Sequence, residues 1–296
     1  MTTRVRLGDY TTTELGDLLR SSDPTAVIPV GSCEQHGPHL PLDTDRFLAE
    51  AVALEACSKS GDVLLPSIPI GYNEKELDFP GTVSLPARVF LDMMIGIGRS
   101  LQTAGWRRLV IVNGHGWNND LVRAATHVLN ESPGFNTACC SYWSLCLEEI
   151  RRLRESPVPG GMAHACEFET SLMLHLRPES VRVDMLTDEV SYVRLRHLHH
   201  DLVEKSAMFV PERFRDLSES GVIGRASCAT AEKGRVWFEA CARRLAEFLL
   251  DFRAAFPRVA APTGSASTRL ASTGSAPAGP ASADAQSTPQ FPVVAP

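Results

Sequence analysis

Short apolar runs alternate with helical patterns along most of this chain, and this alternation limits the folds that it can adopt. Residues 26–30 and 108–113 are continuous apolar runs of strand length, and helical periodicity follows them at 45–60 and 120–130. This spacing is typical of βαβ units, in which helices cover both faces of a parallel sheet. We therefore predict an α/β fold with a single three-layer domain and a mostly parallel sheet. Further strands are expected at 62–69 and 136–143, and further helices at 86–104, 144–155, 231–256 and, after a glycine-started loop at 160, up to 176. Residues 7–19 form a short N-terminal element, in which 11–14 offer a capping-type helix start.

Potential metal ligands are concentrated directly after the two apolar runs. The first run is followed by Glu34, His36, His39, Asp43 and Asp45, and the second by His115 between two glycines. Because ligands bind at the carboxyl ends of the strands in such sheets, these side chains are expected to meet. Gly31 and Gly37 would permit the turns that return Asp45 to the same point. A polar surface loop is the plainer alternative, but so dense a set of hard and borderline ligands favours a metal site.

Four of these residues suit a divalent metal. Glu34, His36, Asp45 and His115 supply two carboxylates and two imidazoles, which zinc, manganese and iron(II) accept. Asp45 has two oxygens and could bridge two ions, with Glu34 and His115 on one ion and His36 on the other. We predict one or two divalent ions that activate water and polarise a substrate carbonyl. A helix-capping or core role is the alternative for His115.

Residues 160–171 carry two further candidates. His164 and Glu169 lie where a loop becomes helical, so both can face a cleft at a helix N-terminus. Each is a candidate catalytic residue as a proton shuttle, and Glu169 is also a candidate metal ligand. A helix N-terminal charge is the alternative for Glu169. Cys33 and Cys166 lie beside the ligand-rich segments, where packing is favoured over a nucleophilic role.

Composition and charge exclude several classes of partner. The formal net charge of −6 argues against binding to nucleic acid or to an anionic membrane. There is no apolar run of membrane-spanning length and no secretory h-region at the N-terminus. The eight cysteines form no Cys-x-x-Cys pair, which indicates reduced thiols and a cytoplasmic protein.

Two segments fall outside the strand and helix alternation. Residues 191–214 contain His197, His199 and His200, but no suitably spaced carboxylate or cysteine, so we interpret them as a surface or substrate-covering segment. From about residue 257 Ala, Ser, Thr, Pro and Gly dominate, a composition that cannot bury enough apolar surface to order itself. We predict a folded domain over 1–256 and a disordered tail over 257–296.

Several motifs together resemble the creatininase (creatinine amidohydrolase) family. The first is GSCEQHGPHLP at 31–41 followed by DTD at 43–45, and four others occur in the order of the family: FPGT at 79–82, NGHG at 113–116, HACEFETS at 164–171 and ATAEKG at 229–234. The resemblance spans roughly residues 5–255. It implies one α/β domain that assembles as a homo-oligomer, often a hexamer, and hydrolyses C–N bonds of small cyclic or linear amides with one or two divalent ions. It also implies Glu34, His36, Asp45 and His115 as ligands, with His164 and Glu169 at the reacting centre.

The sequence departs from creatininase itself after the strand-end histidine. Creatininase has Tyr and a ligand Glu there, whereas this chain has Gly116 and Trp117, so Glu169 is the expected substitute ligand and creatinine is a doubtful substrate. Other branches have Gly-Gly-Asn and act on a formylamino-pyrimidine nucleotide, a mycofactocin precursor peptide or a keto-inositol ring. Peptide trimming and ring opening are thus alternatives to a small amide, and a non-catalytic metal-binding protein is a third. The candidate substrate-binding residues are Trp117, Trp143, Tyr142 and Thr82.

Overall fold

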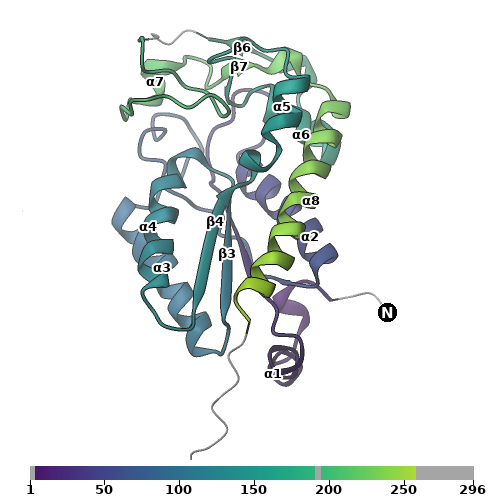
Figure 1. Ribbon diagram of the computed structural model, residues 1–296. Helices are drawn as coiled ribbons and strands as arrows, with labels where there is room; N and C mark the ends of the chain where they lie inside the picture. The colour runs from purple at the N-terminus through teal and green to yellow at the C-terminus, as the bar shows by residue number, and fades with distance from the viewer. Residues whose placement is uncertain (1–3, 191–194, 258–296) are drawn as a thin grey trace, which may run out of the picture. The chain divides into compact units, whose positions relative to one another are not determined.

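A four-stranded parallel sheet forms the centre of the fold in the computed structural model, which describes residues 4–190 and 195–257 (Figure 1). The strand order is β2-β1-β3-β4. In the central pair Val30 is aligned with Asn113, so both strands end at the same level and release their following loops at one edge. The strand bounds are β1 Ala26–Val30, β2 Val63–Leu64, β3 Arg108–Asn113 and β4 Asn136–Ser141.

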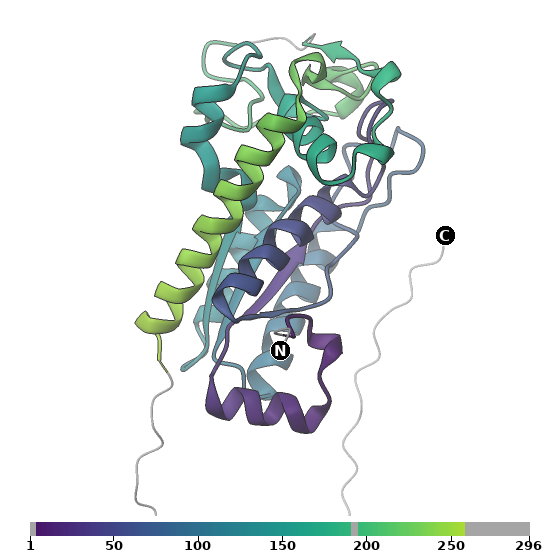
Figure 2. The same ribbon diagram turned by 90° about the vertical axis from the view of Figure 1, so that its right-hand side faces the viewer.

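Helices cover both faces of this sheet. Helices α3 (Ala87–Thr103) and α4 (Asn119–Asn130) pack on one face, and α2 (Thr44–Ser60) and α8 (Ala231–Ala255) on the other (Figures 1 and 2). Because side chains alternate along a strand, Ile28 belongs to one apolar cluster and Val27 to the other. The predicted three-layer α/β architecture is therefore confirmed.

A small antiparallel sheet, which the sequence analysis did not predict, lies at the carboxyl end of the main sheet (Figure 1). Its strands are β5 (Met162–His164), β7 (Ile223–Arg225) and β6 (Asp188–Glu189), in that order. Strands of two or three residues are too short to show a period of two. Their pairing therefore depends on tertiary contacts that the sequence pattern does not reveal.

Several predicted boundaries shift for local reasons. Only Val63–Leu64 of the expected strand at 62–69 pairs as a strand, since Pro66 and Pro69 have no N–H for a ladder. The strand expected at 136–143 ends at Ser141, where a 3₁₀ turn begins (Tyr142–Cys146). The remaining helices are α1 Thr12–Ser21, α5 Leu147–Leu153, α6 Glu167–Leu176 and α7 Phe214–Leu217, with further 3₁₀ turns at Leu7–Asp9, Gly116–Asn118, Pro178–Ser180, Val183–Met185 and Ala226–Cys228.

The first helix starts where we expected, after Thr11, which caps it. The Thr11 hydroxyl accepts from the Glu14 N–H, and the Glu14 carboxylate accepts from the Thr11 N–H, which completes the predicted capping box. None of the helices in the described ranges is both long and apolar enough to cross a membrane. The predicted cytoplasmic location stays a prediction, and the predicted tail falls outside the described residues except for Pro257.

Close packing of α6 on α8 gives a testable prediction. A Cβ at Gly234 of α8 would lie 1.9 Å from the Ser171 carbonyl oxygen of α6. We expect Gly234→Ala to lower the free energy of unfolding by about 1–3 kcal/mol in urea denaturation, because the two helices must separate. The matched control is Gly96→Ala on α3, where a Cβ meets nothing within 4 Å, so its effect should be neutral or stabilising. Equal stabilities of the two variants would contradict this packing.

Candidate metal centre

Two glycines let the start of α2 approach the strand ends. A Cβ at Gly31, after β1, would lie 2.3 Å from the Arg46 Cα, and one at Gly114, after β3, would lie 2.4 Å from the Asp45 carbonyl oxygen. Both positions therefore require glycine for close approach. We predicted a turn at both Gly31 and Gly37. Gly37 has a φ of +62° and forms such a turn, whereas Gly31 does not have a positive φ. The result is that Asp45 is held against the ends of both central strands.

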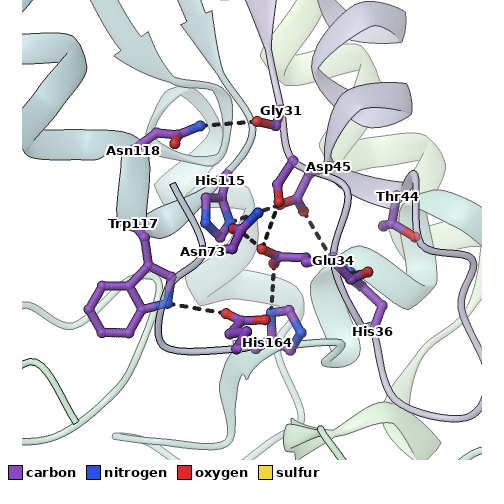
Figure 3. Close-up of polar contacts among 12 residues, drawn as sticks. Gly31, Glu34, His36, Thr44, Asp45, Asn73, His115, Trp117, Asn118 and His164 are labelled. Carbon is purple, nitrogen blue, oxygen red and sulfur yellow. Dashed lines mark hydrogen bonds and ion pairs between the residues drawn. The ribbon is translucent and has the colours of Figure 1, made fainter. Parts of the chain in front are cut away.

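Four predicted ligands converge at this point (Figure 3). His115 Nδ1 lies 2.9 Å from Glu34 Oε2 and 3.0 Å from Asp45 Oδ2. His36 Nε2 lies 3.0 Å from Asp45 Oδ1. All four side chains are at most 3% exposed, so these polar groups lie in a buried cluster and away from bulk water.

The ligand atoms form two separable groups that share one residue. Glu34, Asp45 and His115 make one group, and His36, Asp45 and Glu169 make the other, with the ligand atoms of each within 4.8 Å of one another. A third possible group contains Glu34, His36 and His164, and it takes one residue from each of the first two. The first two groups can therefore each hold an ion at the same time. An ion in the third group would need Glu34 and His36, which belong to the first two groups.

The outward nitrogens of the histidines have partners that orient the rings. His115 Nε2 lies 3.1 Å from the Tyr72 carbonyl oxygen, and His164 Nε2 lies 2.9 Å from the Gln35 carbonyl oxygen. A carbonyl partner on one nitrogen leaves the other free to face a cation, as in ligating histidines generally. The Ser32 hydroxyl donates to Glu34 Oε2 at 2.9 Å.

Electrostatics within the cluster suits a cation. Burial raises the pKa of Glu34. Burial alone would lower the pKa of His36, but the Asp45 carboxylate outweighs it and raises that pKa to about 10. Burial would raise the pKa of Asp45, yet His36 and His115 hold it low. Without a metal, protons on the imidazoles thus compensate the buried carboxylates.

The donor set fits a divalent metal. Glu34 Oε1 is buried and accepts no hydrogen bond from the residues that the structure describes. Buried carboxylates without partners are costly, and they are paired or bound to metal in most proteins. Carboxylate and imidazole are also the donors that zinc, manganese and iron(II) accept. Glu34, Asp45 and His115 would hold one ion, and His36, Asp45 and Glu169 a second.

Glu169 lies at a helix N-terminus as predicted, whereas His164 belongs to a strand and not to the loop that we expected before the helix. His164 ends β5, and Glu169 lies in the first turn of α6. Ala165 between them has a φ of +49°, an uncommon conformation for a residue with a Cβ, and the chain bends there. His164 Nδ1 lies 3.6 Å from Glu34 Oε1, and its ring centroid lies 4.4 Å from that of His36. Burial raises the pKa of Glu169 to about 7, while burial and His36 hold the pKa of His164 well below its usual range.

A cavity of about 500 Å³ opens onto the cluster. Two of the four predicted substrate-binding residues line it, Trp117 and Trp143. Tyr142 does not, because it is 1% exposed and packs between Trp143 and Phe168. Thr82 does not either, since its hydroxyl accepts from the Gln35 N–H at 3.1 Å. Neither residue is placed to touch a substrate in this cavity.

The segment around the predicted histidines covers part of the cavity. His199, His200 and Phe209 line it, and the Phe209 ring meets Trp117 edge to face at a centroid distance of 6.1 Å. This placement agrees with the prediction of a substrate-covering segment for the described part, 195–214. His197 does not line the cavity.

Glu76 is a cavity residue that the sequence analysis missed. It is 1% exposed, and its Oε1 accepts from Trp117 Nε1 at 3.1 Å. Burial and the nearby Glu34 carboxylate raise the pKa of Glu76 well above its usual range. In the sequence, only the length of the loop at 71–83 indicated a functional residue there. A carboxylate in a polar loop is normally solvated, so the residue type gave no further signal.

The other candidates have structural partners. His39 Nε2 lies 2.9 Å from the Thr170 hydroxyl, and Asp43 pairs with Arg46 and Arg177 outside the cluster. Burial raises the pKa of both thiols, Cys33 and Cys166, which favours packing over a nucleophilic role.

Comparison with known proteins identifies the family. A family model described as creatinine amidohydrolase (Creatininase) matches residues 8–249. The chain belongs to the creatininase family. It is 35% identical over 254 residues to a mycofactocin precursor peptide peptidase of Mycobacterium ulcerans (strain Agy99), covering 80% of this chain and 90% of that protein. It is 28% identical over 271 residues to a creatinine amidohydrolase of Pseudomonas putida, covering 87% of this chain and 99% of that protein.

Solved structures agree with this assignment. A mutant creatininase described as the Zn-Zn type superposes with a TM-score of 0.72 and 27% identity, covering 86% of this chain and 98% of the other. The resemblance inferred from the motifs is confirmed, and so is the enzyme class. This protein is a creatininase-family amidohydrolase, a hydrolase acting on C–N bonds.

Proposed function

We propose that this amidohydrolase hydrolyses a C–N bond of a small cyclic or linear amide with two divalent ions held by its buried cluster. The observation that carries the proposal is Asp45, which is shared by two ligand groups that are otherwise distinct. The Zn-Zn description of a solved relative supports two ions, and zinc, manganese and iron(II) all suit these donors. When bound, paired ions make a water acidic near neutral pH and polarise the amide carbonyl.

We assign the proton transfers of the reaction to His164. Its ligand group competes with the two filled groups, so we assign it to proton transfer and not to the metal. The low pKa of His164 leaves the imidazole neutral at pH 7, with Nδ1 facing Glu34 and Nε2 at the Gln35 carbonyl. A neutral Nδ1 can accept a proton from the attacking water and return it to the leaving nitrogen. Glu169 completes the second ligand group in place of the acidic residue that creatininase has at position 117.

A substrate screen tests the proposal. Creatinine, hydantoins, formamides and short peptides should be offered to the protein with added zinc, manganese or iron(II). We expect hydrolysis of at least one amide class, and we expect chelation of the metal to abolish it. A protein that holds its ions and hydrolyses none of these compounds would support the alternative of a non-catalytic metal-binding relative.

Peptide trimming is a second candidate, and the cavity favours it. Its volume of about 500 Å³ falls in the range of drug-sized ligand sites, more than a five-membered ring fills. Arg123 and Lys205 line it and form no ion pair within the described ranges, so they are available to a peptide carboxylate. The relative from Mycobacterium ulcerans is named as a peptidase. Hydrolysis of short peptides but not of hydantoins in the screen would select this candidate.

Ring hydrolysis of a keto-inositol and assembly as a homohexamer stay predictions.

Trp117 provides a prediction about substrate preference. Its ring forms a wall of the cavity with Phe209 and lies two residues after His115. We expect Trp117→Gly to change the ratio of kcat/KM between two amides of the screen by about tenfold or more, since an aromatic wall contributes about 1–3 kcal/mol to discrimination. The metal content should stay unchanged. An unaltered ratio would count against Trp117 as a pocket wall.

A further inference from the structure

Glu76 is a buried carboxylate whose hydrogen bonding is incomplete. It lies in the loop between β2 and α3, is 1% exposed, and lines the same cavity as Glu34 and His115. Oε1 accepts from Trp117 Nε1 at 3.1 Å, but Oε2 accepts nothing from the described residues. An unpaired buried polar group costs roughly 1–3 kcal/mol, and more if it is charged, so a partner is expected in the working protein.

The missing partner is not one of the metal ions of the proposed centre. Glu76 belongs to none of the three groups whose ligand atoms lie within 4.8 Å of one another. Trp117 fixes the orientation of the carboxylate instead, and the Trp117 ring is itself held against Phe209. In the metal-free protein the pKa of Glu76 is raised, but cations held by Glu34 and Asp45 would favour its ionised form. An ionised carboxylate only accepts hydrogen bonds, so its natural partner in the cavity is an N–H group.

We propose that Glu76, oriented by Trp117, is a specificity-determining residue that accepts a hydrogen bond from an N–H of the amide substrate. This inference rests on the proposed amide hydrolysis and narrows the substrate class to amides that carry an N–H beside the cleaved bond. A site built to accept a hydrogen bond rejects an analogue that lacks the donor, because the buried acceptor then stays unpaired. N-methylation of the substrate should therefore weaken binding.

Glu76→Gln separates recognition from loop structure. The glutamine amide keeps the size of the side chain, and its oxygen can still accept from Trp117 Nε1, so the loop contact is retained. Its NH₂ group then replaces the free acceptor with a donor, which opposes a substrate N–H. The matched control is Glu74→Gln, which removes a carboxylate from the same loop at an exposed position that does not line the cavity.

Two pairs of probes are bound to zinc-loaded protein and followed by calorimetry: hydantoin with 1,3-dimethylhydantoin, and formanilide with N-methylformanilide. We expect the wild-type protein and Glu74→Gln to bind the N–H member of at least one pair about tenfold or more tightly. Glu76→Gln should lose this difference while its zinc content, measured by atomic emission, stays unchanged. Trp117→Phe, which removes only the orienting N–H donor, should reduce the difference and keep zinc.

The inference is overturned if Glu76→Gln keeps the preference, if it loses zinc, or if the wild-type protein shows no preference in either pair. Failure of the proposed function would look different. In that case the metal-loaded wild type would hydrolyse no amide of the screen, whatever preference the binding measurements show.

Discussion

Replacing Asp45 with asparagine is expected to lower kcat/KM for any amide substrate by at least about a thousandfold. Asp45 is the one residue common to both ligand groups, with Oδ1 facing His36 and Oδ2 facing His115. Asparagine keeps the shape but removes the negative charge that would bind both ions. Metal catalysis contributes several kcal/mol, and about 4 kcal/mol corresponds to three orders of magnitude in rate.

The fold should survive this substitution. Asp45 is absent from both apolar clusters, so the near-ultraviolet circular dichroism of Asp45→Asn should match that of the wild type. The matched control is Asp43→Asn, two residues away, whose half-exposed carboxylate pairs with Arg46 and Arg177. It should lose only a surface ion pair and keep its activity within about twofold. An Asp45→Asn protein that hydrolyses amides at the wild-type rate would show that the proposed mechanism is wrong.

Metal binding is expected to release protons, at least about one for each ion. In the metal-free protein the pKa of His36 is about 10 and that of His115 is raised well above its usual range by Glu34 and Asp45 against the effect of burial. Both imidazoles are therefore protonated at pH 7. A metal binds only the neutral imidazole and the ionised carboxylate. Filling both ligand groups should therefore release about two protons per chain from His36 and His115, and a further fraction of a proton from Glu169, whose pKa is about 7. Zinc titration of the chelator-treated protein in weakly buffered solution measures this directly.

The raised pKa of His36 determines how pH changes the stability of the metal-free protein and its affinity for metal. The folded pKa of His36, about 10, lies above the unfolded value of about 6.5. The metal-free protein therefore has the full stabilisation from His36 below pH 6.5 and loses it as the pH rises through about 10. Metal affinity moves the opposite way and should rise about tenfold per pH unit for each displaced proton. Zinc binding to the His36→Gln variant should release about one proton fewer than zinc binding to the wild type. Zinc saturation of the wild-type protein with no proton release would contradict this mechanism.

The sequence was sufficient to predict that the candidate ligands meet, because strand ends converge by topology. Glu34, His36 and Asp45 follow β1 and His115 follows β3, and neighbouring parallel strands end at one edge whatever their other contacts. The apolar periodicities of α2, α3, α4 and α8 also gave boundaries within about two residues.

Features that depend on contacts between distant segments were not predictable in this way. Glu76 is buried beside Trp117, which comes from another loop and donates to its carboxylate. His164 reaches the cluster through β5, whose pairing with β7 spans about sixty residues of chain. Tyr142 was assigned to the substrate by motif, but its ring packs on Phe168 of α6, which no local pattern indicates.

We infer that Asp45 would be shared by two cations at the ends of β1 and β3. Anomalous scattering from crystals of the zinc-loaded protein locates these cations. We expect two peaks about 3.5 Å apart, one contacted by Glu34 and His115, the other by His36 and Glu169, and both by Asp45. A zinc-loaded crystal with no peak beside Asp45, or with zinc held only by other residues, would contradict it.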